Sequence, residues 1–146
     1  MTFEIGSILL VKDYQLSTKV KDKFFIVIGH SEHETHLMSM TTSQIYFDVS
    51  LIKHGLIVDR EMSVYCFEKG KVIGKNGFAF RKHTFVSHRN NIHGFSPEKI
   101  NSLNVENIDC LIREELTDLI YSVYQKSPPK YMHVFENILS KITNFE

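Results

Sequence analysis

The sequence predicts an α+β fold, in which a small antiparallel β-barrel is followed by C-terminal amphipathic helices. Residues 1–87 contain short apolar, β-branched or aromatic runs bounded by polar segments, as strands do. After Gly94 the apolar residues recur every three or four positions, which is typical of helices. The chain has 146 residues, 42% of them hydrophobic, which suits one core that needs no disulfide or structural metal. We therefore expect a single domain, residues 1–146, made of a β part (1–94) and a helical part (95–146).

The predicted strands are short, and their number favours a closed barrel over an open sheet. Continuous apolar runs such as SILLVK and KFFIVIG are too short for helices. Five such strands within 87 residues would leave unpaired edges in an open sheet, and closure removes those edges. We expect strands at residues 7–12, 23–29, 37–42, 62–67 and 78–87, with turns at 30–36 and 74–77.

The helical part begins with a recognisable start signal. Ser96 is a good N-cap residue, and Pro97 suits the first helical position. Apolar residues spaced by three and four from Val105 to Tyr124 predict one amphipathic helix. The Ser-Pro-Pro sequence at 127–129 breaks this pattern, and a second helical stripe follows at residues 131–142. We expect these helices to pack on the barrel or on a partner.

The charges of the chain balance, but they are unevenly distributed. The formal net charge is zero, with 17 basic and 17 acidic residues, which argues against a generic polyanion binder. Residues 1–94 hold twelve Lys or Arg and nine Asp or Glu, whereas residues 95–146 hold five and eight. Residues 69–94 hold six basic residues, three histidines and no acidic residue. That excess suits contacts with phosphate groups, although a solvated hairpin would have the same composition.

Two further features predict a cytoplasmic protein without membrane contact. No apolar run approaches the roughly 18 residues of a membrane helix. The first residues, MTFEIGSILLVKD, lack the basic stretch and the long apolar block of a signal peptide. Cys66 and Cys110 have no metal-binding spacing, so we expect two free thiols in a reducing compartment. Cys66 alternates with aromatic residues and is expected in the core, not as a nucleophile.

The strongest cluster of chemically useful residues lies at the ends of two neighbouring strands. Lys23 opens one predicted strand, and Thr42 and Ser43 end the next. An antiparallel hairpin would bring these ends together, so that an ammonium group faces two hydroxyls. Such a group can bind a phosphate and stabilise charge on a pentavalent phosphorus intermediate. The same residues also fit a solvated lysine and ordinary turn formers, so the pattern alone leaves both interpretations open.

Histidines and aromatic residues offer weaker candidates. His30, His33 and His36 are spaced by three and could hold zinc, but the intervening glutamates favour a solvated loop. We therefore expect no metal and no other cofactor. Tyr46, Phe47, Phe78 and Phe80 could stack on bases if exposed, whereas aromatic residues in a small barrel usually fill its core.

The start of the chain resembles the MazF/PemK toxin superfamily. The resemblance rests on the segments GSILLV at 6–11, KFFIVI at 23–28 and MSMTTSQ at 38–44. In that family a strand of the type G-D-I-V-L-V precedes a basic residue that opens an apolar strand, and a third strand ends in Thr-Ser. Ser7, Phe24 and Met40-Thr41 replace the family's usual Asp, Pro and Pro-Leu or Pro-Ile. A lysine as the basic residue is similar to the ToxN-like toxins, whose partner is an antitoxin RNA.

This resemblance implies an SH3-like barrel with helices and the metal-independent cleavage of single-stranded RNA, leaving 2′,3′-cyclic phosphate and 5′-hydroxyl ends. Lys23 then stands at the position of the catalytic cation, and Thr42 and Ser43 at that of the hydroxyl pair. A lysine is a poor base at pH 7 unless burial or a nearby cation such as Lys21 lowers its pKa. The residues expected to guide the RNA are Lys21, Gln44, Lys69, Lys71, Lys75, Arg81 and Lys82.

The expected partners are single-stranded RNA, an antitoxin that is either RNA or protein, and a second copy of the chain in a homodimer. The alternative function is that of a catalytically inactive SH3-like barrel, which binds RNA or a protein and uses its amphipathic helices as the contact surface.

Overall fold

The computed structural model describes residues 3–41, 49–59, 62–87, 92–124 and 136–137. The strands in these residues are β1 (Ser7–Gln15), β2 (Val20–His30), β3 (Thr35–Ser39), β4 (Gly55–Asp59), β5 (Met62–Phe67), β6 (Thr84–Ser87), β7 (Ile92–Phe95) and β8 (Asn104–Cys110). The helical elements are η1 (Val49–Leu51), a single 3₁₀ turn, and the α-helices α1 (Pro97–Ser102) and α2 (Arg113–Tyr124).

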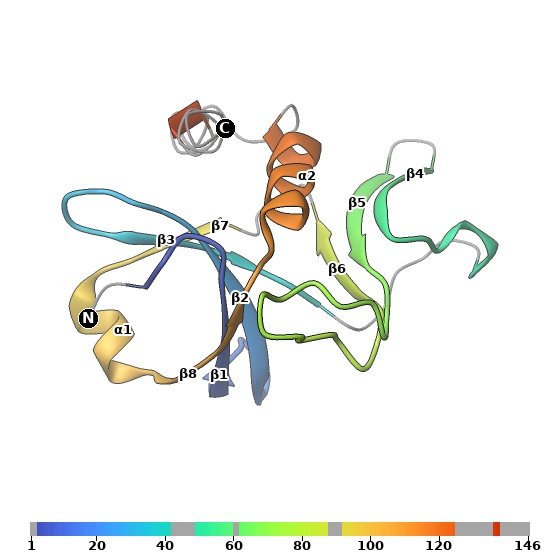
Figure 1. The fold of residues 1–146 in the computed structure, drawn as a ribbon. Coiled ribbons are helices and arrows are strands. Elements are labelled where there is room, and N and C mark those ends of the chain that lie inside the picture. The colour runs from blue at the N-terminus through green and yellow to red at the C-terminus, as the bar shows by residue number, and fades with distance from the viewer. Residues whose placement is uncertain (1–2, 42–48, 60–61, 88–91, 125–135, 138–146) are drawn as a thin grey trace.

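The strands form two antiparallel sheets, which confirms the predicted α+β class. The larger sheet has the order β7-β3-β2-β1-β8, and the smaller one has the order β4-β5-β6. Figure 1 shows α2 standing between the two sheets, while α1 lies beside β7 and β8 at the other side of the larger sheet. No helix in the described residues is both long enough and apolar enough to cross a membrane.

The chain passes from one sheet to the other directly after β3. Thr41 forms an isolated antiparallel bridge with Phe85 of β6, with backbone hydrogen bonds of 3.0 and 2.8 Å in the two directions. This bridge joins the sheets at one corner. The pairings of the described residues do not close a ring of strands, so the SH3-like barrel stays a prediction.

The larger sheet buries both of its faces, because neighbouring residues on each strand point to opposite sides. Ile8, Ile26 and Met38 are register partners on the face turned towards the smaller sheet and α2. Leu9 and Phe25 belong to a second cluster, on the opposite face of the sheet. Ile100 of α1 and Leu103, the C-cap residue of this helix, cover that cluster. The continuous apolar run of β2 reflects burial on both sides.

One helix prediction is wrong in its first part. Residues 104–110, expected at the start of the long amphipathic helix, form β8 and pair with β1, and only Arg113–Tyr124 is helical. The register shifts beside Ile108, because Leu9 pairs with Asn107 while Ile8 pairs with Asp109. Val105 therefore packs on one face of the sheet and Ile108 on the other. A spacing of three residues suggested that both lie on one face of a helix, but in this bulged strand the two residues lie on opposite faces of the sheet.

Other boundaries differ less. The predicted strand at 78–87 is shorter, because only β6 is extended and residues 78–83 belong to a loop. β4 and β7 were not predicted, since each is only four or five residues long. The helix start is confirmed: Ser96 Oγ accepts a hydrogen bond from Lys99 N at 3.2 Å, and Pro97 is the first helical residue. The break at 127–129 lies outside the described residues, as does almost all of the second stripe at 131–142.

Candidate functional site

Lys23 lies inside β2, three residues after the strand begins at Val20, so the prediction that it opens the strand is wrong. It pairs with Val11 of β1, and the register then shifts in a bulge that contains Asp13, whose φ is 54°. The Asp13 N–H donates to Asp22 Oδ1 at 3.0 Å, so this neighbouring carboxylate has a backbone partner. Bulges of this kind bend a strand and change the direction of a side chain. The predicted hairpin of the second and third strands is confirmed, with Phe25 opposite Ser39.

The predicted hydroxyl partners of Lys23 are not described. Thr42, Ser43 and Gln44 lie outside the described residues, as do Tyr46 and Phe47. Thr41 is the last described residue before them. Met40, one residue earlier, donates its N–H to Phe24 O at 3.2 Å. The structure therefore describes the hairpin that carries the predicted site, and the roles of Thr42, Ser43 and Gln44 stay predictions.

Three strands place other polar side chains on the Lys23 face of the sheet. Ser39 of β3 is opposite Phe25, and Phe25 is two residues from Lys23, so all three point to the same side. His93 of β7 shares that side: its Nε2 lies 3.3 Å from Ser39 Oγ, and its ring centroid lies 6.0 Å from that of Phe25. The sheet thus gathers an ammonium, a hydroxyl and an imidazole on one face.

Burial and mutual repulsion weaken the charged forms of both basic groups. Burial lowers the pKa of Lys23 below its usual 10.5, and the nearby charge of Lys21 lowers it further. Burial also lowers the pKa of His93 below 6.5, and the charge of Lys23 adds to this effect. Both causes named for Lys23 match the sequence-based expectation. Both shifts favour the neutral forms, so the cluster combines an imidazole that can accept a proton with a cation that releases its proton more readily than an ordinary lysine.

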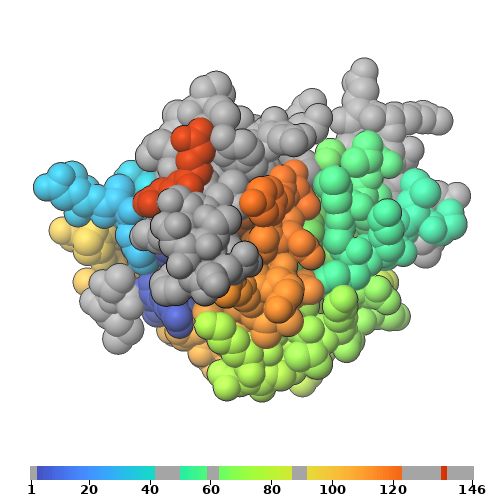
Figure 2. Space-filling model, turned by 45° about the horizontal axis from the view of Figure 1, so that its top comes forward, coloured from blue at the N-terminus to red at the C-terminus, as the bar shows by residue number. Residues whose placement is uncertain are grey.

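Five of the seven residues predicted to guide the RNA lie in one loop, residues 68–83, which we call the basic loop, whereas Lys21 lies on β2. Figure 2 shows this loop in yellow-green along the lower margin of the molecule, beneath α2. Its exposed basic residues are Lys69, Lys71, Lys75, Arg81 and Lys82. Lys75 Nζ lies 3.9 Å from a carboxylate oxygen of Glu4, at the side chain's exposed end.

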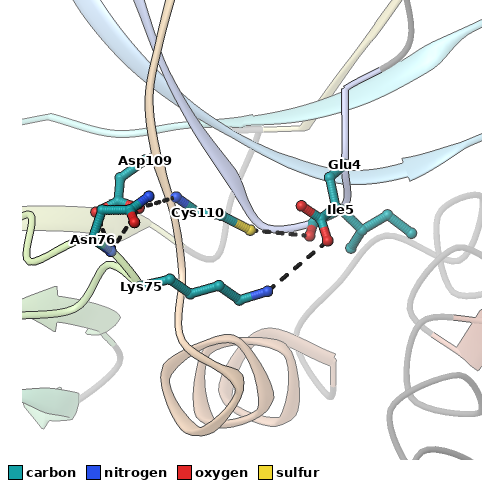
Figure 3. A network of polar contacts seen from close by, with 6 residues as sticks. All are labelled: Glu4, Ile5, Lys75, Asn76, Asp109 and Cys110. Carbon is teal, nitrogen blue, oxygen red and sulfur yellow. Dashed lines mark hydrogen bonds and ion pairs between the residues drawn. The ribbon is translucent and has the colours of Figure 1, made fainter.

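A buried carboxylate fixes the basic loop on β8. Asp109, 6% exposed, accepts hydrogen bonds from the backbone N–H groups of Asn76 and Phe78 at 3.1 Å and of Cys110 at 2.7 Å. The Asn76 side-chain amide adds a fourth donor at 3.2 Å (Figure 3). Burial alone would raise the pKa of Asp109, but these donors outweigh it and the pKa is lowered. Gly74 must lack a side chain, because a Cβ there would lie 2.1 Å from Asp109 Oδ2.

The basic loop and Lys23 lie on opposite faces of β2. Phe78 and Phe80 of the loop contact the ring of Phe24, with centroids 6.1 and 5.0 Å away. Phe24 and Lys23 are neighbours in the strand and point to opposite sides. Phe78 is half-buried and Phe80 is buried, so these two aromatic residues fill the core as the sequence suggested. A nucleic acid that contacts both the loop and Lys23 must therefore pass around the end of β2.

The three histidines of the β2–β3 hairpin do not converge. His30 contacts Thr35 Oγ1 at 3.2 Å and Phe3 O at 2.6 Å, whereas His33 is exposed beside Glu32. His36 Nε2 lies 3.9 Å from Glu34 Oε1. Within the described ranges no group of three or more His, Cys, Asp or Glu residues is arranged to hold a metal ion.

The two cysteines are free, and their thiols differ in environment. Cys66 is buried in the smaller sheet, where burial and the charge of Glu68 raise its pKa to about 11. Cys110 is half-buried, and its Sγ lies 3.7 Å from Ile5 O (Figure 3). Burial raises the pKa of Cys110 as well. The expectation that Cys66 belongs to the core is confirmed, because its side chain is fully buried in a hydrophobic cluster.

A buried histidine–glutamate pair holds α2 against the smaller sheet, and no pattern in the sequence predicted it. His54 Nε2 lies 2.5 Å from Glu115 Oε1 of α2, and His54 Nδ1 accepts the Glu68 N–H at 3.1 Å. Because Nδ1 accepts, the proton of the neutral ring is on Nε2 and is donated to the carboxylate. Sixty-one residues separate the two partners, so no local pattern could reveal them.

His93 was also missed as a site residue, although one signal was present. It was counted only within the basic segment at residues 69–94. Apolar residues flank it at positions 92 and 95, and reading 92–95 as a strand would have placed His93 on the same side as Phe95. Comparison with known proteins adds nothing to these assignments: the chain matches no family model, no curated protein and no solved structure.

Proposed function

We propose that the protein is a metal-independent endoribonuclease of the toxin type, which cleaves single-stranded RNA. The observation that carries the proposal is the placement of Lys23, half-buried beside a bulge in the β1–β2 pairing, with a lowered pKa and with a hydroxyl and an imidazole on the same face. The resemblance of the first 45 or so residues to the MazF/PemK superfamily adds the reaction class and the SH3-like barrel.

The proposed reaction is a transesterification. The ribose 2′-oxygen attacks the adjacent phosphorus, the bond to the 5′-oxygen breaks, and the products carry a 2′,3′-cyclic phosphate and a 5′-hydroxyl. Lys23 transfers a proton or stabilises the charge on the phosphorane, and Thr42 and Ser43 hold the phosphate oxygens. Lys21, Gln44 and the basic loop guide the RNA strand through its phosphates.

A second candidate function is RNA binding without cleavage. The observation that favours it is the position of the basic loop, which exposes five cations on the face of β2 opposite to Lys23. A loop fixed by Asp109 could bind phosphates without any contribution from the Lys23 cluster.

One experiment separates the two. Single-stranded RNA is incubated with the protein in EDTA, and the product ends are identified by mass spectrometry. We expect 2′,3′-cyclic phosphate and 5′-hydroxyl ends, lost in Lys23→Met and kept in Lys12→Met, whose lysine is exposed on the same sheet beside Glu106. Intact RNA that is bound by the protein would support the second function. Cleavage that needs added metal would contradict the proposed reaction.

A further inference from the structure

The face of the larger sheet that carries Lys23 offers a second group able to transfer a proton. We propose that His93 is the general base of this site and that Ser39 orients its ring, an inference that rests on the proposed ribonuclease function. Lys23 then does not act as the base, a role for which an ammonium group is poorly suited. It stabilises negative charge at the phosphate and acts as the general acid.

The geometry of three adjacent strands supports this assignment. β2, β3 and β7 are neighbours in the sheet, and their register sets Lys23, Ser39 and His93 on the face that carries Phe25, whose ring contacts that of His93. The contact between His93 Nε2 and Ser39 Oγ, at 3.3 Å, lets the neutral ring carry its proton on Nε2. The lone pair of Nδ1 then remains as the base, and Nδ1 has no hydrogen-bond partner among the described residues.

The charges around His93 favour its neutral form. Lys23 on β2 lowers the pKa of His93, and Lys21 follows two residues away on the same strand. The carboxylate of Glu34 lies against Gly94, next to His93 in the chain and on the other side of β7, with His36 beside it. On α1, the helix that contacts β7, the charged residues are exposed: Glu98 and Lys99.

His93 and Lys23 together account for both proton transfers of the reaction. His93 Nδ1 takes the proton of the ribose 2′-hydroxyl as the 2′-oxygen forms its bond to phosphorus. The ammonium of Lys23 stabilises the charge of the phosphorane and gives a proton to the 5′-oxygen as that bond breaks. The imidazolium and the neutral amine then return to their starting forms when a proton passes from His93 to Lys23. A histidine with a lowered pKa and a lysine with a lowered pKa are suited to these two roles at neutral pH.

The electrostatic coupling can be tested without any activity. The imidazole protons of His93 are followed by NMR across pH in the full chain, with exposed His33 as the internal reference. We expect the titration midpoint of His93 to move to higher pH in Lys23→Met, because the charge of Lys23 is gone. Equal midpoints of His93 in the two proteins would overturn the proposal.

The catalytic role is tested by the pH dependence of single-turnover RNA cleavage. We expect His93→Gln to slow cleavage at pH 7 at least 100-fold and to remove the rise in rate with pH that the neutral base produces, with RNA affinity changed less than tenfold. His33→Gln is the matched control and should keep both rate and profile. A His93→Gln protein that keeps the wild-type pH profile overturns this inference alone. A wild-type protein that does not cleave RNA overturns the proposed function and this inference together. If His93→Gln does not fold, the NMR titration decides.

Discussion

Two histidines of this protein pack against aromatic rings in a similar way but have opposite electrostatic surroundings. His93 lies against Phe25 and Phe95, and His54 lies against Tyr65 and Phe67, all with ring centroids about 6 Å away. His93 has a lysine and a hydroxyl nearby, whereas His54 donates to the buried carboxylate of Glu115 and accepts a backbone N–H.

The difference shows how the neighbours of an imidazole decide what it can do. Both ring nitrogens of His54 are used in contacts that fix α2 on the smaller sheet, so His54 stabilises the fold and has no nitrogen left for chemistry. His93 lies beside a cation that holds it neutral, and a cation next to a base contributes little to stability. We therefore expect changes at His93 and Lys23 to alter RNA cleavage, and changes at His54 and Glu115 to alter the free energy of unfolding.

The largest expected effect is on the rate of RNA cleavage. Lys23→Met removes a charge that acts mainly on the phosphorane, so the single-turnover rate should fall by about two to four orders of magnitude while affinity falls tenfold or less. Single-turnover kinetics and equilibrium binding on the same RNA measure both. A variant that binds poorly but cleaves its bound RNA at the normal rate would make Lys23 a phosphate anchor.

The next largest effect is on the free energy of unfolding and concerns His54. Glu115→Ala leaves the Nε2–H of His54 unpaired in a site where both side chains are almost fully buried. We expect a loss of about 3 kcal/mol in the free energy of unfolding, seen as a melting temperature lower by about 6–12 °C. RNA cleavage by the folded fraction should be unchanged. A stability within about 0.5 kcal/mol of wild type would show that the pair does not hold α2.

A smaller loss in the free energy of unfolding is expected when Asp109, the carboxylate that fixes the basic loop, is replaced. Asp109→Asn presents an amide N–H₂ to the N–H donors of Asn76 and Phe78, which should cost about 2 kcal/mol. Because the folded pKa of Asp109 lies below its usual 3.8, this carboxylate contributes stability above pH 3.8 that is lost as the pH falls through the folded pKa. Denaturant unfolding at a series of pH values should show a shallower acid loss in Asp109→Asn. The same acid loss in both proteins would contradict the assignment.

The contribution of the basic loop should appear in the salt dependence of RNA binding. Replacing Lys71, Lys75 and Lys82 together with Gln should flatten the slope of log affinity against log salt by about 0.7 for each lost phosphate contact. Exposed Lys12 and Lys53 provide a matched pair of control substitutions outside the loop. An unchanged slope in the triple variant would remove the loop from the RNA-binding surface.

The smallest expected effect is the change in thermal stability caused by Lys23→Met. Because the folded pKa of Lys23 is lowered from 10.5, its charged form costs stability below the folded pKa, and the cost vanishes above the unfolded value. The variant should melt at the same temperature as wild type, or slightly higher, at pH 7. A clear loss of stability in thermal unfolding would make Lys23 a structural residue, like His54.

The sequence predicted those parts of the fold in which a local pattern has one structural meaning. The run at residues 23–29 is apolar throughout because β2 is buried on both faces, and the Ser96-Pro97 start is set by backbone chemistry within one turn. The spacing of Val105 and Ile108 has two meanings, and only pairing with β1 decides between them.

The candidate site was predictable in part for the same reason. Lys23 stood out because it precedes an apolar run beside a second strand, and its lowered pKa was expected from Lys21 two residues away. His93 joins it through β3 and β7, an arrangement of strands that no local pattern contains. The contact between Asn76 and Asp109, 33 residues apart, likewise depends on the tertiary fold.

A double-mutant cycle on RNA cleavage tests most directly the claim that Lys23 and His93 form one proton-transfer site. Single-turnover rates are measured for wild type, Lys23→Met, His93→Gln and the double variant, with Glu115→Ala combined with Lys23→Met as the reference pair. If the two groups act in one step, the double variant should be little slower than the slower single variant. Rate losses that multiply in the Lys23 and His93 pair, as they should for independent residues, would contradict the account.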